Sequence, residues 1–272
     1  MTDPRLWRIL SYGIVAFAVL VLIYLVLPTL VIVPLSFSSE TFLSFPPPGF
    51  SLQWYDAFAQ SPDYRIAILN SVKIGLPAAL FATVFGTLAA LALVRGHLPG
   101  RRLLSALMIA PLILPQIVLA IGLFPIMVKL GIIGSYAGIL LGHTVLALPL
   151  VFITVAAALK SYAPTYELAA MTLGANRWNT FRFVTLPMIK PGVIVGFIFA
   201  FAFSFDELIL AIFLTNPATR TVPRLLWEHL NYQMTPVIAA ATVVLLVITL
   251  SMLAVAAVIA RTSAGKAKGS AS

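Results

Sequence analysis

Residues 136–159 read YAGILLGHTVLALPLVFITVAAAL, a stretch that contains no Asp, Glu, Lys or Arg. A helix needs about 20 consecutive apolar residues to cross about 30 Å of hydrocarbon, because each residue rises about 1.5 Å. Only helices and closed barrels satisfy their backbone hydrogen bonds in lipid, and a continuous apolar run of this length is typical of a helix. The stretch therefore predicts a membrane-spanning helix.

The remainder of the chain repeats this pattern. Of its 272 residues, 61% are hydrophobic and 9% are charged, whereas a soluble domain is about 45–50% apolar and about 25% charged. We therefore predict an all-α membrane protein, residues 1–272 forming a single transmembrane domain. Six spans are expected, at about Ile9–Leu35, Ile66–Val94, Leu103–Val128, Tyr136–Leu159, Pro191–Leu214 and Pro236–Ala260. The longer runs must tilt, project beyond the bilayer, or kink at a proline such as Pro115.

Basic residues predict the orientation. Twelve of the seventeen Lys and Arg residues fall on one side of the predicted spans: Arg5, Arg8, Arg95, Arg101, Arg102, Lys160, Arg177, Arg182, Lys190, Arg261, Lys266 and Lys268. The positive-inside rule places that side, and with it both termini, in the cytoplasm. We therefore expect a multi-pass protein of the bacterial inner membrane. The net charge of +9 forms no basic stripe interleaved with aromatics, so we expect no nucleic-acid partner. The chain has no cysteine, which excludes disulfides, thiolate catalysis and Cys-ligated metals.

The connection between the fourth and fifth predicted spans, about residues 163–187, differs from the other loops because it is long, cytoplasmic and mixed in polarity. Pro164 suits a first helical turn, and good helix formers follow as far as Pro187. On a helix, Glu167, Ala170 and Gly174 would share one face. A glycine inside a helix costs about 0.5–1 kcal/mol relative to alanine, so Gly174 implies either a close approach by another surface or a turn. Composition alone leaves a lipid-surface helix equally open.

This segment resembles the EAA motif of ABC importer permeases, in which a cytoplasmic coupling helix docks on the ATPase subunit. The positions of that motif are occupied here by Ala169, Ala170, Gly174, Val184, Leu186 and Pro187. Leu168 stands where the motif has a glutamate, and Glu167 lies one position earlier. The resemblance implies that Glu167, Ala169, Ala170, Gly174, Leu186 and Pro187 couple the chain to an ATPase.

The likeness extends over about residues 45–261 and is similar to the second permease of spermidine/putrescine-type importers. It includes FPPPGFSLQWY at 45–55, LPQIV at 114–118, FSFDE at 203–207 and TVP at 221–223. The resemblance implies a type I ABC importer permease fold. It also implies three protein partners besides the lipid bilayer: an ABC ATPase dimer, a second homologous permease and a periplasmic binding protein. No cofactor is expected in this chain, since ATP and Mg would bind the partner ATPase, and no Walker A loop is present here.

The implied cargo is a small organic cation such as putrescine or spermidine. Where polyamine permeases often have Glu and Asn after a proline at the start of the last span, Pro236 is followed by Val237, Ile238 and Ala239. Opines, amino-acid-like compounds or other small polar cargo therefore remain open as alternatives.

Three polar residues inside predicted spans are candidates for the cargo pathway. A carboxylate at the centre of a bilayer costs roughly 2.5–3.5 kcal/mol, so Asp206 and Glu207 should face a cavity or a partner. Either they line the route of a cationic cargo, or they pair with a basic group of a partner permease. Gln116 follows Pro115, where a broken helix would expose backbone carbonyls to a pathway or simply bend the span. His143 is expected to form a helix–helix hydrogen bond, and Gly138 and Gly142 a close approach between spans.

The sequence argues against two other classes of function. A membrane-embedded enzyme would need clustered carboxylates for metal or a nucleophile–base pair, whereas this chain has one Asp-Glu pair and three scattered histidines. We therefore expect no catalytic residue and no metal site. A self-contained channel or secondary transporter would not need a coupling segment.

Overall fold

The computed structural model describes residues 4–232 and 235–269. The side chains of Arg5, Arg8, Lys266 and Lys268, which contribute to the charge bias, lie outside the described part. The helices are α1 (Pro4–Ser36), α2 (Gln53–Gln60), α3 (Pro62–Arg95), α4 (Arg101–Ile113), α5 (Gln116–Lys129), α6 (Tyr136–Lys160), α7 (Thr165–Thr172), α8 (Arg177–Thr180), the π-helical turn η1 (Phe181–Thr185), α9 (Leu186–Phe205), α10 (Ile209–Leu214), α11 (Val222–Tyr232) and α12 (Pro236–Gly269).

The chain divides into two compact units. The smaller comprises Met1–Ser61 and His229–Leu246, and within it a loop after α1 is fastened to α2. There the Trp54 indole donates to the Ser38 carbonyl at 2.7 Å, and the Ser36 and Tyr55 hydroxyls lie 2.7 Å apart. The larger unit comprises Pro62–Glu228 and Val247–Ser272 and contains every candidate site residue.

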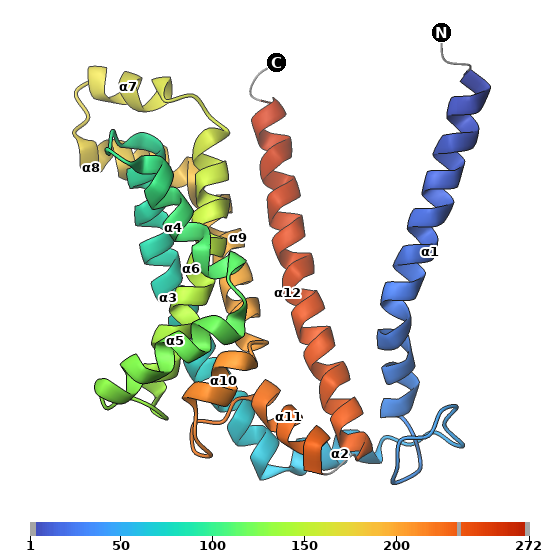
Figure 1. The fold of residues 1–272 in the computed structure, drawn as a ribbon. Helices are drawn as coiled ribbons and strands as arrows, with labels where there is room; N and C mark the ends of the chain where they lie inside the picture. The colour runs from blue at the N-terminus through green and yellow to red at the C-terminus, as the bar shows by residue number, and fades with distance from the viewer. Residues whose placement is uncertain (1–3, 233–234, 270–272) are drawn as a thin grey trace. The chain divides into compact units, whose positions relative to one another are not determined.

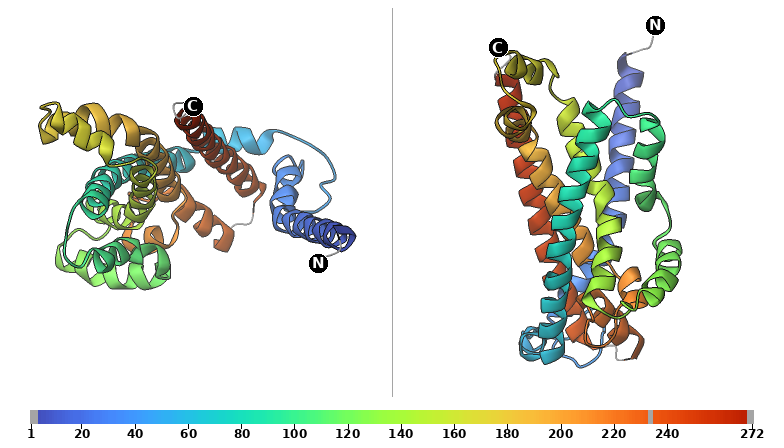
Figure 2. Two further views of the ribbon diagram at one scale, coloured as in Figure 1. Left: turned by 90° about the horizontal axis from the view of Figure 1, so that it is seen from above. Right: turned by 90° about the vertical axis from the view of Figure 1, so that its left-hand side faces the viewer.

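The larger unit is built on α3, α6 and α9, which run side by side (Figures 1 and 2). Small side chains line their contacts, so the backbones approach closely: Ala79, Ala82, Ala90, Ala147 and Ala200 are fully buried in one cluster. At Gly142 on α6, a Cβ would lie 2.8 Å from Leu210 Cδ2 and 2.9 Å from Leu214 Cδ1. The predicted close approach at Gly142 is confirmed, and its neighbour is α10.

Four predicted spans are present as α1, α3, α6 and α12. Together with residues 177–205 they give five helices, within the described residues, that are long and apolar enough to cross a membrane. A bent pair, α4 and α5, would make a sixth span if the two count as one.

The third predicted span is not one helix. Residues 103–128 belong to α4 and α5, which are bent by 102° at the Leu114–Pro115 break (Figure 2, right). Leu114 has φ −68° and ψ 139°, the extended conformation that a residue before proline prefers, and Pro115 has no N–H with which to continue the α4 ladder. The apolar run predicted the position of this span correctly, and Pro115 divides it into two helices.

The fifth predicted span, Pro191–Leu214, is also divided. Helix α9 ends at Phe205, and α10 begins only at Ile209. The Glu207 carboxylate accepts hydrogen bonds from the backbone N–H groups of Leu210 and Ala211 and so starts a new helix there. Asp206 and Glu207 therefore lie at a break between two helices. The sequence had predicted a single continuous span at this place.

Candidate functional site

The predicted coupling segment lies at one end of the α3–α6–α9 bundle, where α7 and α8 stand clear of the core (Figure 1). The sequence predicted one helix from Pro164 to Pro187, and this is wrong. Helix α7 ends at Thr172, a turn follows at Gly174, and α8 with η1 then leads into α9. Gly174 therefore does not share a helical face with Glu167 and Ala170.

Gly174 occupies the turn that the sequence offered as the alternative. Its φ is +90°, in the left-handed region that disfavours side chains, and its N–H donates to the Met171 carbonyl. The Ala175 N–H donates back to Ala170, and the Asn176 side chain caps α8 by accepting from the Asn179 N–H at 2.8 Å. A Cβ at Gly174 would meet no atom of this chain within 4 Å, so the surroundings of the turn are open.

The side chain of Glu167 points into the chain. Its Oε1 accepts hydrogen bonds from the Tyr162 hydroxyl at 2.6 Å, from Thr185 Oγ1 at 3.0 Å and from Arg95 Nε at 3.3 Å. The Arg95 guanidinium also donates from Nη2 to the Leu159 carbonyl at 2.8 Å and lies over the Tyr162 ring. These residues, called here the Glu167 anchor, join α7 to the end of α3, the end of α6 and η1.

Two local features assemble the Glu167 anchor. The π-helical turn of η1 brings the Thr185 hydroxyl toward α7, and such turns are frequent at functional positions. Burial, with the hydrogen bond to Glu167 next, raises the pKa of the Tyr162 phenol, which therefore stays protonated as a donor. In the sequence, Arg95 indicated only the orientation of the spans, and no periodic pattern predicted its contact with Glu167.

The other predicted coupling residues lie around this anchor. Ala169 and Gly174 are exposed, Ala170 is half-buried, and Leu186 and Pro187 open α9 on its exposed side. The outward surface is apolar: Leu173 is 89% exposed and Leu168, at the position where the motif has its glutamate, is 56% exposed. Such a surface can be covered only by lipid or by another protein.

The three candidate pathway residues come together. Gln116, Asp206 and Glu207 line one cavity of about 580 Å³, although Gln116 is far from the two acids in the sequence. The remaining lining is mostly apolar, with Phe199, Phe203 and Leu150 among it. The break between α4 and α5 and the break between α9 and α10 place these polar groups there.

The two neighbouring acids have different surroundings. Glu207 is buried, caps α10, and lies with its Oε2 3.7 Å from His143 Nε2. His143 Nδ1 lies 2.7 Å from the Ser204 hydroxyl, which confirms the predicted hydrogen bond between spans. Asp206 is exposed to the cavity, and its carboxylate makes no hydrogen bond or ion pair within the described part of the chain. Of the two acids, Asp206 has the carboxylate free to meet a ligand.

Comparison with known proteins assigns the family. A family model described as "Binding-protein-dependent transport system inner membrane component" matches residues 82–264. The spermidine/putrescine transport system permease protein PotC of Escherichia coli (strain K12) is 30% identical over 238 residues, which cover 88% of this chain and 90% of PotC. The chain belongs to this family of inner-membrane components. The putrescine transport system permease protein PotI of the same organism is 32% identical over 230 residues, covering 82% of each chain.

Solved structures share the fold of this permease. A bacterial ABC transporter that imports the acidic polysaccharide alginate matches with a TM-score of 0.70 at 17% identity, over 94% of this chain and 98% of that one. The MetNI methionine ABC transporter matches with a TM-score of 0.60 at 18% identity, over 72% and 94%. The fold is that of type I ABC importer permeases, and the chain is a permease subunit of an ABC importer.

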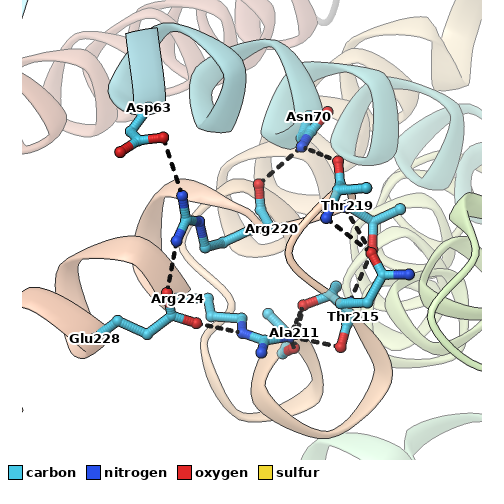
Figure 3. A network of polar contacts seen from close by, with 10 residues as sticks. Asp63, Asn70, Ala211, Thr215, Thr219, Arg220, Arg224 and Glu228 are labelled. Atoms are coloured by element: carbon cyan, nitrogen blue, oxygen red, sulfur yellow. Dashed lines mark hydrogen bonds and ion pairs between the residues drawn. The ribbon is translucent and has the colours of Figure 1, made fainter. Parts of the chain in front are cut away.

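The end of the permease opposite α7 carries a polar network that the sequence did not predict (Figure 3). Arg220 pairs with Glu228 at 2.9 Å and with Asp63 at 3.3 Å, and Arg224 pairs with Glu228 at 2.9 Å. Asn70 donates to the carbonyls of Ala218 and Arg220, both at 2.9 Å. The network ties the loop between α10 and α11 to α3. Its sequence signals were the family likeness at 221–223 and at Asn70-Ser71, which indicated no contact between the two.

Proposed function

We propose that this permease passes a small organic cation, such as putrescine or spermidine, from a periplasmic binding protein across the bacterial inner membrane. The observation that carries the proposal is the Asp206 carboxylate, which faces a cavity together with Gln116 and has no cation partner in the described chain. An unpaired acid in an apolar surrounding favours a positively charged ligand. The relatives PotC and PotI, which are permeases of spermidine/putrescine and putrescine transport systems, support the same cargo class.

The proposed machinery has further parts. ATP and Mg bind a separate ATPase dimer, this chain pairs with a second homologous permease, and both of its termini lie in the cytoplasm. The exposed apolar surface around Leu168 and Leu173 supports an ATPase contact, as does the open turn at Gly174. A solved relative of the same fold contains a substrate-bound periplasmic protein, which supports that kind of partner. ATP-driven closure of the ATPases would move α7, and the Glu167 anchor would pass that movement to α3, α6 and α9.

The cargo is tested first on the cognate binding protein. In a thermal-shift screen of polyamines, opines and amino acids, we expect polyamines alone to raise its unfolding midpoint. A midpoint raised only by opines or amino acids would overturn the cationic cargo and leave the importer function standing.

The role of Asp206 is tested by uptake into proteoliposomes that contain the assembled importer. Asp206→Asn should raise KM for the cationic cargo about tenfold, since loss of one ion pair in an apolar site costs about 1.4 kcal/mol or more. Asp206→Glu, which keeps the charge, is the matched control. Unchanged uptake kinetics in a normally assembled Asp206→Asn complex would remove Asp206 from the pathway.

The ATPase contact is tested at the turn. Gly174→Trp should leave the protein in the membrane but abolish cargo-stimulated ATPase activity, because the indole would occupy the space into which the ATPase docks. Gly174→Ala also places a side chain at this positive φ but adds little bulk, so it separates the effect of backbone strain from that of steric exclusion. Normal stimulation in a reconstituted Gly174→Trp complex would exclude Gly174 from the contact.

A further inference from the structure

A second cavity lies between α3, α4 and α6, at the end of the bundle that carries the coupling segment. It has a volume of about 880 Å³, and its lining contains four cations and no acid. The cations are Arg95, Arg101, Arg102 and Lys160. Each belongs to the end of a membrane-spanning element: Arg95 closes α3, Arg101 and Arg102 open α4, and Lys160 closes α6. The charges therefore lie where a span meets the lipid headgroups.

Most of this positive charge is uncompensated. Arg95 is held by Glu167, but Arg101, Arg102 and Lys160 have no acidic partner among the residues that the structure describes. Two arginines in the first turn of a helix also face its positive dipole end, where anions are favoured. Gly100, the residue before this turn, supplies no side chain to cap it. An anion bound in the cavity would relieve all of these charges together.

The rest of the cavity wall is mostly apolar. It contains Val94, Ile109, Phe152, Ile153 and Ala156, and Ser105 and Tyr162 add hydroxyl groups to the lining. Topology bias explains basic residues at the ends of spans, but it requires neither a concave site nor an apolar wall beside it. A ligand that matches both parts has an anionic head and an apolar tail.

We propose that this cavity binds an anionic phospholipid, with its phosphate headgroup against Arg101, Arg102 and Lys160 and an acyl chain along the wall formed by Ile109 and Ile153. Basic pockets between transmembrane helices recognise anionic lipid headgroups by this combination of charge and shape. Arg95 and Tyr162 belong both to this cavity and to the Glu167 anchor. A bound lipid would therefore contact two members of the anchor directly.

The test measures thermal unfolding of the full-length chain, purified with its partner subunits in a maltoside detergent. Dioleoyl phosphatidylglycerol should raise the unfolding midpoint by several degrees in a saturable way, while dioleoyl phosphatidylcholine should not. The double variant Arg101→Gln/Arg102→Gln should weaken the apparent affinity for phosphatidylglycerol about thirtyfold, since each basic residue contributes about one factor of five. Arg182→Gln/Lys190→Gln removes two exposed charges that do not line the cavity, and it should keep the full shift.

A third variant separates the cavity from its charge. Ser105→Trp fills the space and retains all four cations, so it should also lose the shift, even if the double variant fails to assemble. An equal shift with phosphatidylcholine, or with inorganic phosphate alone, would overturn the lipid assignment. So would a shift that persists in Ser105→Trp. Loss of the ATPase subunit from a double variant that otherwise folds would show that this surface docks a protein instead.

Discussion

The two ends of the α3–α6–α9 bundle hold their connecting segments in different ways. At the coupling end, a single carboxylate, Glu167, accepts from three side chains and joins α7 to the rest of the bundle. At the opposite end, Arg220, Arg224 and Asn70 each have two or more partners, and no single group is common to all of the contacts (Figure 3). A segment attached at one point can move as a unit when a partner protein displaces it. A segment held by several hydrogen bonds and ion pairs moves only together with the helix that it contacts.

The two ends of the bundle also differ in how much of their apolar surface is exposed. Around α7 the exposed residues include Leu168 and Leu173, which are 56% and 89% exposed. At the other end Thr219 and Thr221, which belong to the loop that the network fastens, are buried, as is Val222 directly after it. We infer that the coupling end is built to be completed by another subunit, whereas the loop at the opposite end is held by contacts within the chain.

The largest effect is expected from Glu167→Ala. It removes the acceptor for three donors and leaves the Arg95 guanidinium without its acid, so the free energy of unfolding should fall by about 2–3 kcal/mol. This loss is smaller than three charged hydrogen bonds of about 1.5–3 kcal/mol each would give, because the anchor is partly open to solvent. Amides of residues 165–172 should exchange faster with deuterium, and cargo-stimulated ATPase activity should fall more than tenfold.

Asp56→Ala provides the control for that measurement, because Asp56 is an exposed acid that makes no ion pair in the described chain. It should leave exchange at α7 and ATPase stimulation unchanged. If Glu167→Ala lost neither amide protection nor stimulation, the idea that one carboxylate anchors α7 would be wrong.

A smaller effect is expected from Glu228→Ala at the opposite end. The substitution breaks the ion pairs with Arg220 and Arg224, but Arg220 keeps Asp63, and Arg224 keeps the carbonyl and hydroxyl oxygens of Thr215. The loss of stability should therefore be about 1 kcal/mol, with ATPase stimulation preserved. Chemical denaturation of the two variants in the same detergent gives the comparison directly. A loss as large as that of Glu167→Ala would show that the network has no redundancy.

The sequence predicted the spans well where the bilayer alone determines them. Length and hydropathy located α1, α3, α6 and α12 because any helix that crosses the hydrocarbon must meet the same requirement. The same reasoning failed at Pro115 and at Glu207, because hydropathy reports whether a segment suits the hydrocarbon and does not report whether the helical hydrogen bonds continue. At those two places a missing N–H and a capping carboxylate decide the backbone.

The candidate site residues likewise include some that the sequence predicted and some that only the structure shows. The motif around Gly174 could be read from spacing, and the structure shows why its glycine is needed in a turn. The partners of Glu167 could not be predicted, because Arg95 is 72 residues away and only the packing of α3 against α6 brings it there. Asp206 and Glu207 looked alike in the sequence, and only the break before α10 gives one of them a capping role.

The smallest effects come from a matched pair of substitutions, Tyr162→Phe and Tyr136→Phe, one at each end. Each removes one hydroxyl that donates at 2.6 Å, in the first case to the Glu167 carboxylate and in the second to the Asn70 amide oxygen. A hydrogen bond to a charged acceptor contributes about 1.5 kcal/mol or more and a neutral one about 1 kcal/mol or less, so Tyr162→Phe should destabilise the protein more. Only Tyr162→Phe should also speed deuterium exchange in α7, since Asn70 is still held by two backbone carbonyls after Tyr136 loses its hydroxyl. Equal losses at the two ends would mean that Glu167 is no more essential to its segment than Asn70 is to the opposite one, and the distinction between a single anchor and a redundant network would then fail.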